Sequence, residues 1–247
     1  MKKKPLIWLL SFLMAPPLHA GIMPAGTRVI YHAENRERSL MLANTNTYPV
    51  IVQSWIDKGE GNPDAADAPF VVLPAVFRLL PGARQGLRII YNGDPLPQDR
   101  ESVFWINLYE IPPVTKNSAA PAHLTVAMNT QLKLFWRPKA ITLTPEEAVE
   151  KLAFRLVADG TRWEVECDNP TPLNISFSSI TLLNGKAERN VTAQTDMMTP
   201  AFSKRRYPSI YTAFPRQHSR FVFITLMMKA ECWRGQRLFA ASAFSGA

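Results

Sequence analysis

The first half of the chain is a series of short runs in which apolar and polar side chains tend to alternate, with turn residues between them. Leu87, Ile89 and Tyr91 occupy alternate positions of one such run. Successive side chains of a strand point to opposite faces, so these three would share one face. Seven runs have strand character: residues 28–32, 39–43, 50–56, 70–80, 85–91, 103–111 and 124–136. Seven short strands are typical of an immunoglobulin-like β-sandwich.

A second series follows the proline at position 138. Its predicted strands are residues 152–157, 162–167, 173–183, 210–214, 221–228 and 238–243, while residues 146–152 are compatible with one helical turn. The pattern therefore predicts an all-β chain of two sandwiches in tandem. We place the first domain at residues 21–140 and the second at residues 141–247.

Residues 1–20 have the layout of a secretory signal. Three lysines at positions 2–4 precede an apolar run at residues 6–14, and a short segment that ends at the small residue Ala20 follows that run. The run is too short to span a bilayer, and no later segment reaches about 20 consecutive apolar residues. The alternative is a buried N-terminal helix, which Pro16 and Pro17 disfavour. We expect cleavage after Ala20, export, and no membrane insertion.

Composition changes this interpretation little. Proline outnumbers glycine by 21 to 11, which favours strands with proline-marked corners. The formal net charge is +8, but three of those charges belong to the signal and the others are spread along the chain. The sequence therefore predicts no nucleic-acid partner. We interpret the compact basic stretch at residues 204–206 as a solvated loop.

The chain offers few groups for catalysis or metal binding. The histidines of the mature chain, His32, His123 and His218, fall in no metal-ligand spacing, and no nucleotide-binding or hydrolase motif is present. We predict no catalytic residues, no metal and no cofactor. Cys167 and Cys232 would form one disulfide in an oxidising compartment, and two free buried thiols are the alternative.

Two long motifs carry a resemblance to a known family. The runs LPQDRESVFWINLYEIPP (residues 96–113) and LKLFWRP (residues 132–138) resemble the signature of the PapD-like periplasmic pilus chaperones. Residues 26–31, 52–56, 168–172 and 198–203 agree in pattern. The likeness covers most of the mature chain and weakens beyond residue 140. The glycine-rich turn of the family's second domain is not visible, and residues 229–235 occupy that neighbourhood.

The resemblance implies an L-shaped pair of domains with a cleft between them. It implies a periplasmic chaperone that binds, folds and caps pilus subunits by donor-strand complementation and delivers them to an outer-membrane usher. The matching positions are Leu124, Val126 and Met128 for the donor strand, Arg28 and Lys133 for the anchor of the subunit carboxylate, and Glu101 and Arg137 for an interdomain salt bridge. A third, acidic member of that network stays unassigned, with Glu231 as a guess.

The resemblance also extends to a subgroup. Residues 114–122, which join the last two predicted strands of the first domain, are few, as in the short-loop chaperones that serve rod-like pili. Self-association would cover an exposed donor strand in the free protein. The competing hypothesis is an exported immunoglobulin-like adhesion or structural binding module, which would bind through its loops and donate no strand.

Overall fold

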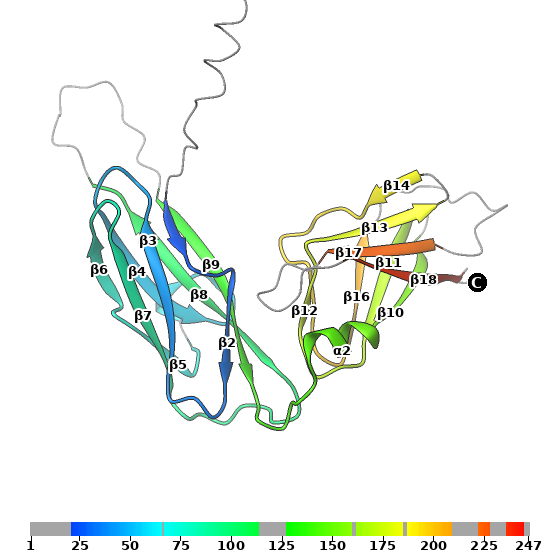
Figure 1. Cartoon of the computed structure of the whole chain (residues 1–247), viewed down its shortest axis with the longest axis horizontal. Coiled ribbons are helices and arrows are strands. Elements are labelled where there is room, and N and C mark those ends of the chain that lie inside the picture. The colour runs from blue at the N-terminus through cyan, green and yellow to red at the C-terminus, as the bar shows by residue number, and fades with distance from the viewer. Residues whose placement is uncertain are drawn as a thin grey trace, which may run out of the picture.

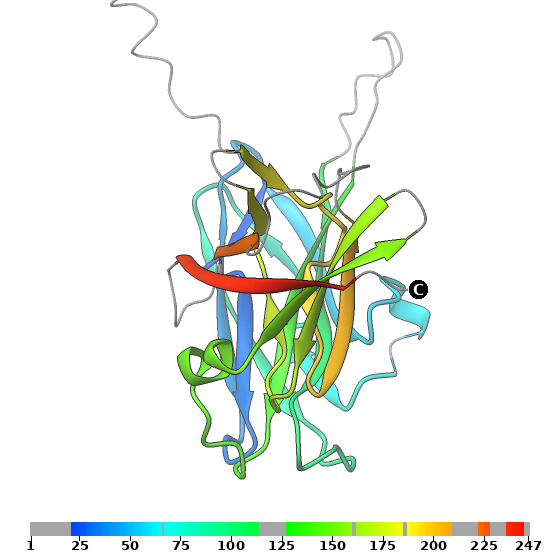
Figure 2. The same cartoon turned by 90° about the vertical axis from the view of Figure 1, so that its right-hand side faces the viewer.

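The computed structural model describes residues 21–65, 67–113, 127–159, 162–184, 187–208, 222–227 and 236–244. Two β-sheet domains stand at an angle to each other and are joined where β9 (Met128–Arg137) leads towards the short helix α2 (Pro145–Glu150) (Figure 1). Turning the molecule by a quarter brings the second domain in front of the first (Figure 2). The prediction of an all-β chain with two sandwich domains is confirmed.

The first domain is built from two facing sheets. One has the strand order β1-β3-β7-β5 and the other the order β2-β9-β8-β4-β6. Their bounds are β1 (Ile22–Pro24), β2 (Arg28–His32), β3 (Arg38–Asn44), β4 (Val50–Asp57), β5 (Phe70–Leu73), β6 (Val76–Leu79), β7 (Arg84–Tyr91) and β8 (Ser102–Ile111), with a 3-10 turn at Pro63–Ala65. Most neighbours are antiparallel, but β2 runs parallel to β9.

The alternation seen in the sequence decides which side chains enter this core. Leu87 and Ile89 on β7, and Ile106 on β8, are fully buried between the sheets. Tyr31 lies at the centre and packs edge-on against Phe70. Burial of apolar surface at about 25 cal/mol per Å² makes this set the main stabilising feature of the domain.

One predicted strand of the first domain divides in two. The run at residues 70–80 becomes β5 and β6, which belong to opposite sheets and are separated at Pro74. Proline lacks a backbone donor and cannot continue a ladder, so the chain changes sheet there. Strand β1 was not predicted, because three residues are too few to show a period.

The second domain contains a seven-stranded sheet in the order β14-β13-β17-β18-β10-β11-β16 and a separate pair, β12-β15. The bounds are β10 (Ala153–Asp159), β11 (Arg162–Asn169), β12 (Ile175–Ser176), β13 (Ser179–Asn184), β14 (Ala187–Asn190), β15 (Met198–Thr199), β16 (Ser203–Pro208), β17 (Val222–Met227) and β18 (Gln236–Phe244). The expected helical turn is α2. Its first residue is Pro145, and Thr144 and Glu147 form a reciprocal capping box.

The basic stretch at residues 204–206 is not a solvated loop, so that expectation was wrong. It lies on β16, antiparallel to β11. Lys204 pairs with Asp168, and Arg206 pairs with Glu166. Acidic partners on the neighbouring strand allow a run of like charges to form a strand. The predicted run at residues 173–183 divides into β12 and β13, and the run at residues 210–214 lies outside the described residues.

Candidate functional site: the cleft between the domains

Parallel pairing of β2 with β9 places two cations side by side. Arg28 lies directly opposite Lys133 in this register. The neighbours of Lys133 on β9, Leu132 and Leu134, point into the core, so Lys133 and Arg28 face outward from the sheet. The guanidinium of Arg28 lies 5.8 Å from the ring centroid of Phe135. Both predicted anchor residues line the cavity between the domains. Their strands, β2 and β9, lie on the side of the first domain that is nearer the second (Figure 1).

These cations line a cavity of about 690 Å³ between the domains. Arg28, Trp105 and Lys133 line it from the first domain, and Phe177 and Asp196 from the second. Its charged lining is three basic side chains, the third being that of Lys58, against one acidic side chain. An excess of cations in a partly enclosed space favours an anionic ligand.

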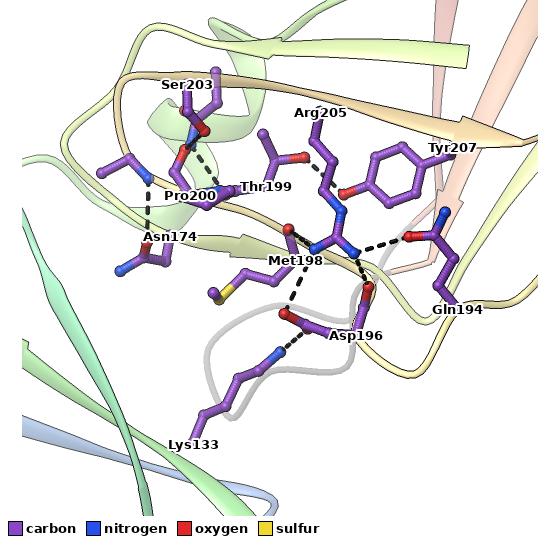
Figure 3. A network of polar contacts seen from close by, with 12 residues as sticks. Lys133, Asn174, Gln194, Asp196, Met198, Thr199, Pro200, Ser203, Arg205 and Tyr207 are labelled. Carbon is purple, nitrogen blue, oxygen red and sulfur yellow. Dashed lines mark hydrogen bonds and ion pairs between the residues drawn. The ribbon is translucent and has the colours of Figure 1, made fainter. Parts of the chain in front are cut away.

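Lys133 already has a partner in this structure. Its ammonium forms an ion pair with the carboxylate of Asp196, which belongs to the second domain (Figure 3). Asp196 also faces Arg205 on β16, at 3.5 Å. Asp196 was not singled out from the sequence. It lies in a polar segment without periodicity, and only the fold brings it to the cleft.

At the joint of the two domains, Glu101 and Arg137 are in contact. Arg137 Nε donates to Glu101 Oε1 over 2.8 Å, and the side chain of Glu101 is only 2% exposed. The other carboxylate oxygen accepts from the backbone N–H of Asn174, again at 2.8 Å. The backbone N–H of Glu101 donates to the carbonyl of Pro172. The acidic third member of this network stays unassigned, because Glu231 lies outside the described residues.

Strand β9 has one open edge along its first half. Residues 128–132 pair with β8 on one side, while β2 begins its pairing only at Lys133. Within the described ranges, no strand covers the edge of residues 128–132, which precede Lys133. Met128, the first residue of β9, is 47% exposed. Leu124 and Val126, the other predicted donor residues, lie outside the described residues.

Cys167 is fully buried on β11. Burial raises the pKa of its thiol to about 12, and a hydrogen bond with Thr199 opposes that rise only in part. A thiol in this environment is a poor nucleophile at neutral pH. Cys167 forms no disulfide with the residues that the structure describes, and Cys232 lies outside them. The pairing of the two cysteines stays a prediction.

Two features are absent from the described residues. They contain no group of three or more His, Cys, Asp or Glu side chains that could hold a metal ion. Within the same residues, no helix has the length and apolar character needed to cross a membrane. The notable features are a cationic cleft, an open strand edge beside it and a joint fixed by a buried carboxylate.

Comparison with known proteins identifies this arrangement. Residues 21–142 match the family described as pili and flagellar-assembly chaperone, PapD N-terminal domain, and residues 147–225 match the PapD C-terminal domain of pili-assembly chaperones. The chain belongs to the PapD family of pilus-assembly chaperones. The chaperone protein FimB/FhaD of Bordetella pertussis is 38% identical to this chaperone over 173 residues, which cover 68% of this chain and 70% of the relative.

Solved structures of other chaperones have the same two-domain fold. The YadV chaperone of Escherichia coli superposes with a TM-score of 0.72 at 28% identity, covering 90% of this chain and 98% of YadV. The SafB chaperone of Salmonella enterica, solved in complex with the SafA pilin, superposes with a TM-score of 0.69 at 26% identity, covering 90% of this chain and 97% of the other. The chain is a periplasmic chaperone of fimbrial assembly, and its activity is not enzymatic. The hypothesis of an adhesion module is set aside.

Proposed function

We propose that this chaperone captures pilus subunits by adding the open edge of β9 to the subunit's incomplete sandwich. The observation that carries the proposal is the position of that edge. It ends at Lys133, where β2 begins and where the two cleft cations meet. An unpaired edge offers a row of backbone donors and acceptors to an extended segment. The cations beside it would fix where that segment stops.

Side chains on the donated edge supply the apolar part of the contact. Leu124, Val126 and Met128 alternate along the chain, so in an extended strand they point to one side. Each would bury apolar surface in the open core of the subunit, at about 25 cal/mol per Å². The exposure of Met128 supports this role, because an exposed apolar side chain contributes free energy of binding when a partner covers it.

The anchor is the pair Arg28 and Lys133. A subunit's C-terminal carboxylate must lose water to enter the cleft, and an unpaired buried carboxylate is costly. Two cations on adjacent strands can both bond to one carboxylate through charge-assisted hydrogen bonds. Their direct opposition in the β2–β9 register supports this role. The same contact would set the register of the inserted segment.

The remaining assignments complete the proposal. Glu101 and Arg137 orient the two domains, and their contact at the joint supports that role. We place the signal at residues 1–20 and the domains at residues 21–140 and 141–247. The small number of residues at 114–122 supports membership of the short-loop subgroup. The loaded chaperone delivers its subunit to an outer-membrane usher, and the free chaperone covers its donor edge by self-association.

Alanine substitution of the two cations tests the anchor. Hydrogen bonds to charged groups contribute about 1.5–3 kcal/mol each, so Arg28→Ala or Lys133→Ala should weaken capture of a coexpressed cognate subunit by about tenfold to a hundredfold. The measurement is the yield of subunit that copurifies with the chaperone. Lys139→Ala is the matched control, because Lys139 is exposed just after β9 and does not line the cavity.

The double variant should lose little more than either single one, since both cations act on one carboxylate. Folding is checked by the thermal unfolding midpoint, which should match that of the Lys139→Ala control. Normal copurification by the folded Arg28→Ala and Lys133→Ala variants would show that the cleft does not hold the subunit's carboxylate.

A further inference from the structure

The cleft contains a carboxylate of its own at the position proposed for the ligand's. Asp196 bonds to Lys133 of the first domain through one oxygen and faces Arg205 of the second domain through the other, at 3.5 Å (Figure 3). In the described residues, this is the only acidic side chain that lines the cavity. A single carboxylate thus bridges cations from both domains.

The second domain holds Asp196 in place without help from Lys133. The guanidinium of Arg205 donates to the backbone carbonyls of Asp196 and Met198, over 2.6 and 2.7 Å, and to Gln194 Oε1 over 2.8 Å. It also lies over the ring of Tyr207, 5.4 Å from its centroid. These contacts fix the segment through its backbone, so they do not depend on the charge of the Asp196 side chain.

The Lys133–Asp196 contact, by contrast, is open to exchange. The side chains are 19% and 33% exposed, and both line the cavity through which an anion would arrive. Ion pairs with access to water are weak, because solvent competes for both charges. An incoming carboxylate can therefore replace Asp196 on the ammonium, while Arg205 remains beside Asp196 and compensates its charge.

We propose that Asp196 occupies the anchor lysine in the free chaperone, so that subunit capture exchanges one carboxylate for another at Lys133. This inference rests on the proposed role of Lys133 as an anchor. Exchange lowers the net free energy gained on binding, because one ion pair is lost for each one formed. It also makes release easier, because Lys133 returns to a partner rather than to an empty cleft.

A peptide titration tests the exchange. The probe is a synthetic peptide of alternating apolar residues with a free C-terminal carboxylate, compared with the same peptide amidated at its C-terminus. Isothermal titration calorimetry on the full chain should give about two- to fivefold tighter binding of the free-carboxylate peptide by Asp196→Asn than by the normal chain. Binding of the amidated peptide should not change. The asparagine keeps the backbone contacts to Arg205, so the variant is expected to fold.

Two further variants separate this inference from the proposed function. Asp168→Asn breaks an ion pair with Lys204 away from the cavity and should leave affinity unchanged. In a Lys133→Ala background, Asp196→Asn should give no gain. A gain that persists without Lys133, or equal binding by Asp196→Asn and the normal chain, would overturn the exchange while leaving the anchor intact. If Lys133→Ala binds the free-carboxylate peptide normally, or if no chain prefers it to the amidated one, the anchor itself is wrong.

Discussion

Glu101 contacts residues of both domains at their joint. It is nearly withdrawn from water, and its two oxygens serve Arg137 and the backbone of Asn174. Breaking a buried ion pair by removing one member leaves the other charge uncompensated. The joint is therefore a place where one side chain affects both domains.

We predict that Glu101→Ala lowers the free energy of unfolding by about 3–5 kcal/mol, because Arg137 would remain mostly buried without its carboxylate. Urea denaturation followed by tryptophan fluorescence measures the change. Glu37→Ala is the control, since its pair with Arg88 is exposed and should contribute less than about 1 kcal/mol. Equal losses in the two variants would refute a special role for the joint.

At the residue scale, the sequence could single out side chains that belong to recognisable motifs. It could not single out residues whose contacts form only when distant segments come together. Arg28 and Lys133 lie in strand-like runs, and Glu101 and Arg137 belong to the two motifs at residues 96–113 and 132–138. Asn174 lies in the predicted run at residues 173–183, but its short contact with Glu101 is made by the backbone N–H, which residue identity does not reveal. Asp196 lies in a polar segment between the short strands β14 and β15, where no period marks a position. Nothing local distinguishes such a side chain from a solvated one, because its partners are far away in the chain.

Strand β9 is the element that connects fold and function. One half is held between β2 and β8, and among the described strands the other half has a neighbour on one side only. The strand thus combines a rigid base with an edge available for pairing. A charge introduced on the donor face of the free half should disturb binding far more than folding.

We therefore predict that Val126→Asp reduces subunit copurification at least tenfold while the chaperone stays folded, since an unpaired carboxylate would enter an apolar groove. Ala127→Asp is the matched control. Ala127 is exposed and points to the opposite face in an extended strand, so the same charge there should reduce recovery much less. Unchanged recovery with Val126→Asp would mean that another segment is donated.

Strands with clear alternation were the predictable elements. The runs at residues 28–32, 50–56 and 85–91 agree with β2, β4 and β7 to within one residue at each end. The strands that were missed are short, as β1 is, or rich in charge, as β14 and β16 are. On β16, the charged side chains that pair with β11 leave no hydrophobic pattern to detect.

At the scale of the whole molecule, export should produce a chain that begins at Gly21. In the described structure the nitrogen of Gly21 donates to Asn46 Oδ1, and Asn46 Nδ2 donates to the buried carboxylate of Glu110. Removal of the signal would make that nitrogen an ammonium in an acidic neighbourhood, which stabilises it.

The intact mass of the periplasmic protein should equal that of residues 21–247 less two hydrogens, and it should rise by two hydrogens on reduction if Cys167 and Cys232 are joined. A larger mass would place the cleavage elsewhere. A mass that reduction leaves unchanged would point to two separate thiols.

The parallel pairing of β2 with β9 has a consequence for how the nascent chain folds. It joins the beginning of the first domain to its end, so it is the contact with nearly the greatest sequence separation in that domain. Contacts between distant segments form slowly, because the chain between them must first lose its freedom. A nascent chaperone crossing the inner membrane therefore has no Arg28–Lys133 pair until its whole first domain has emerged. On the proposed anchor role of this pair, incomplete molecules would be unable to hold a pilus subunit.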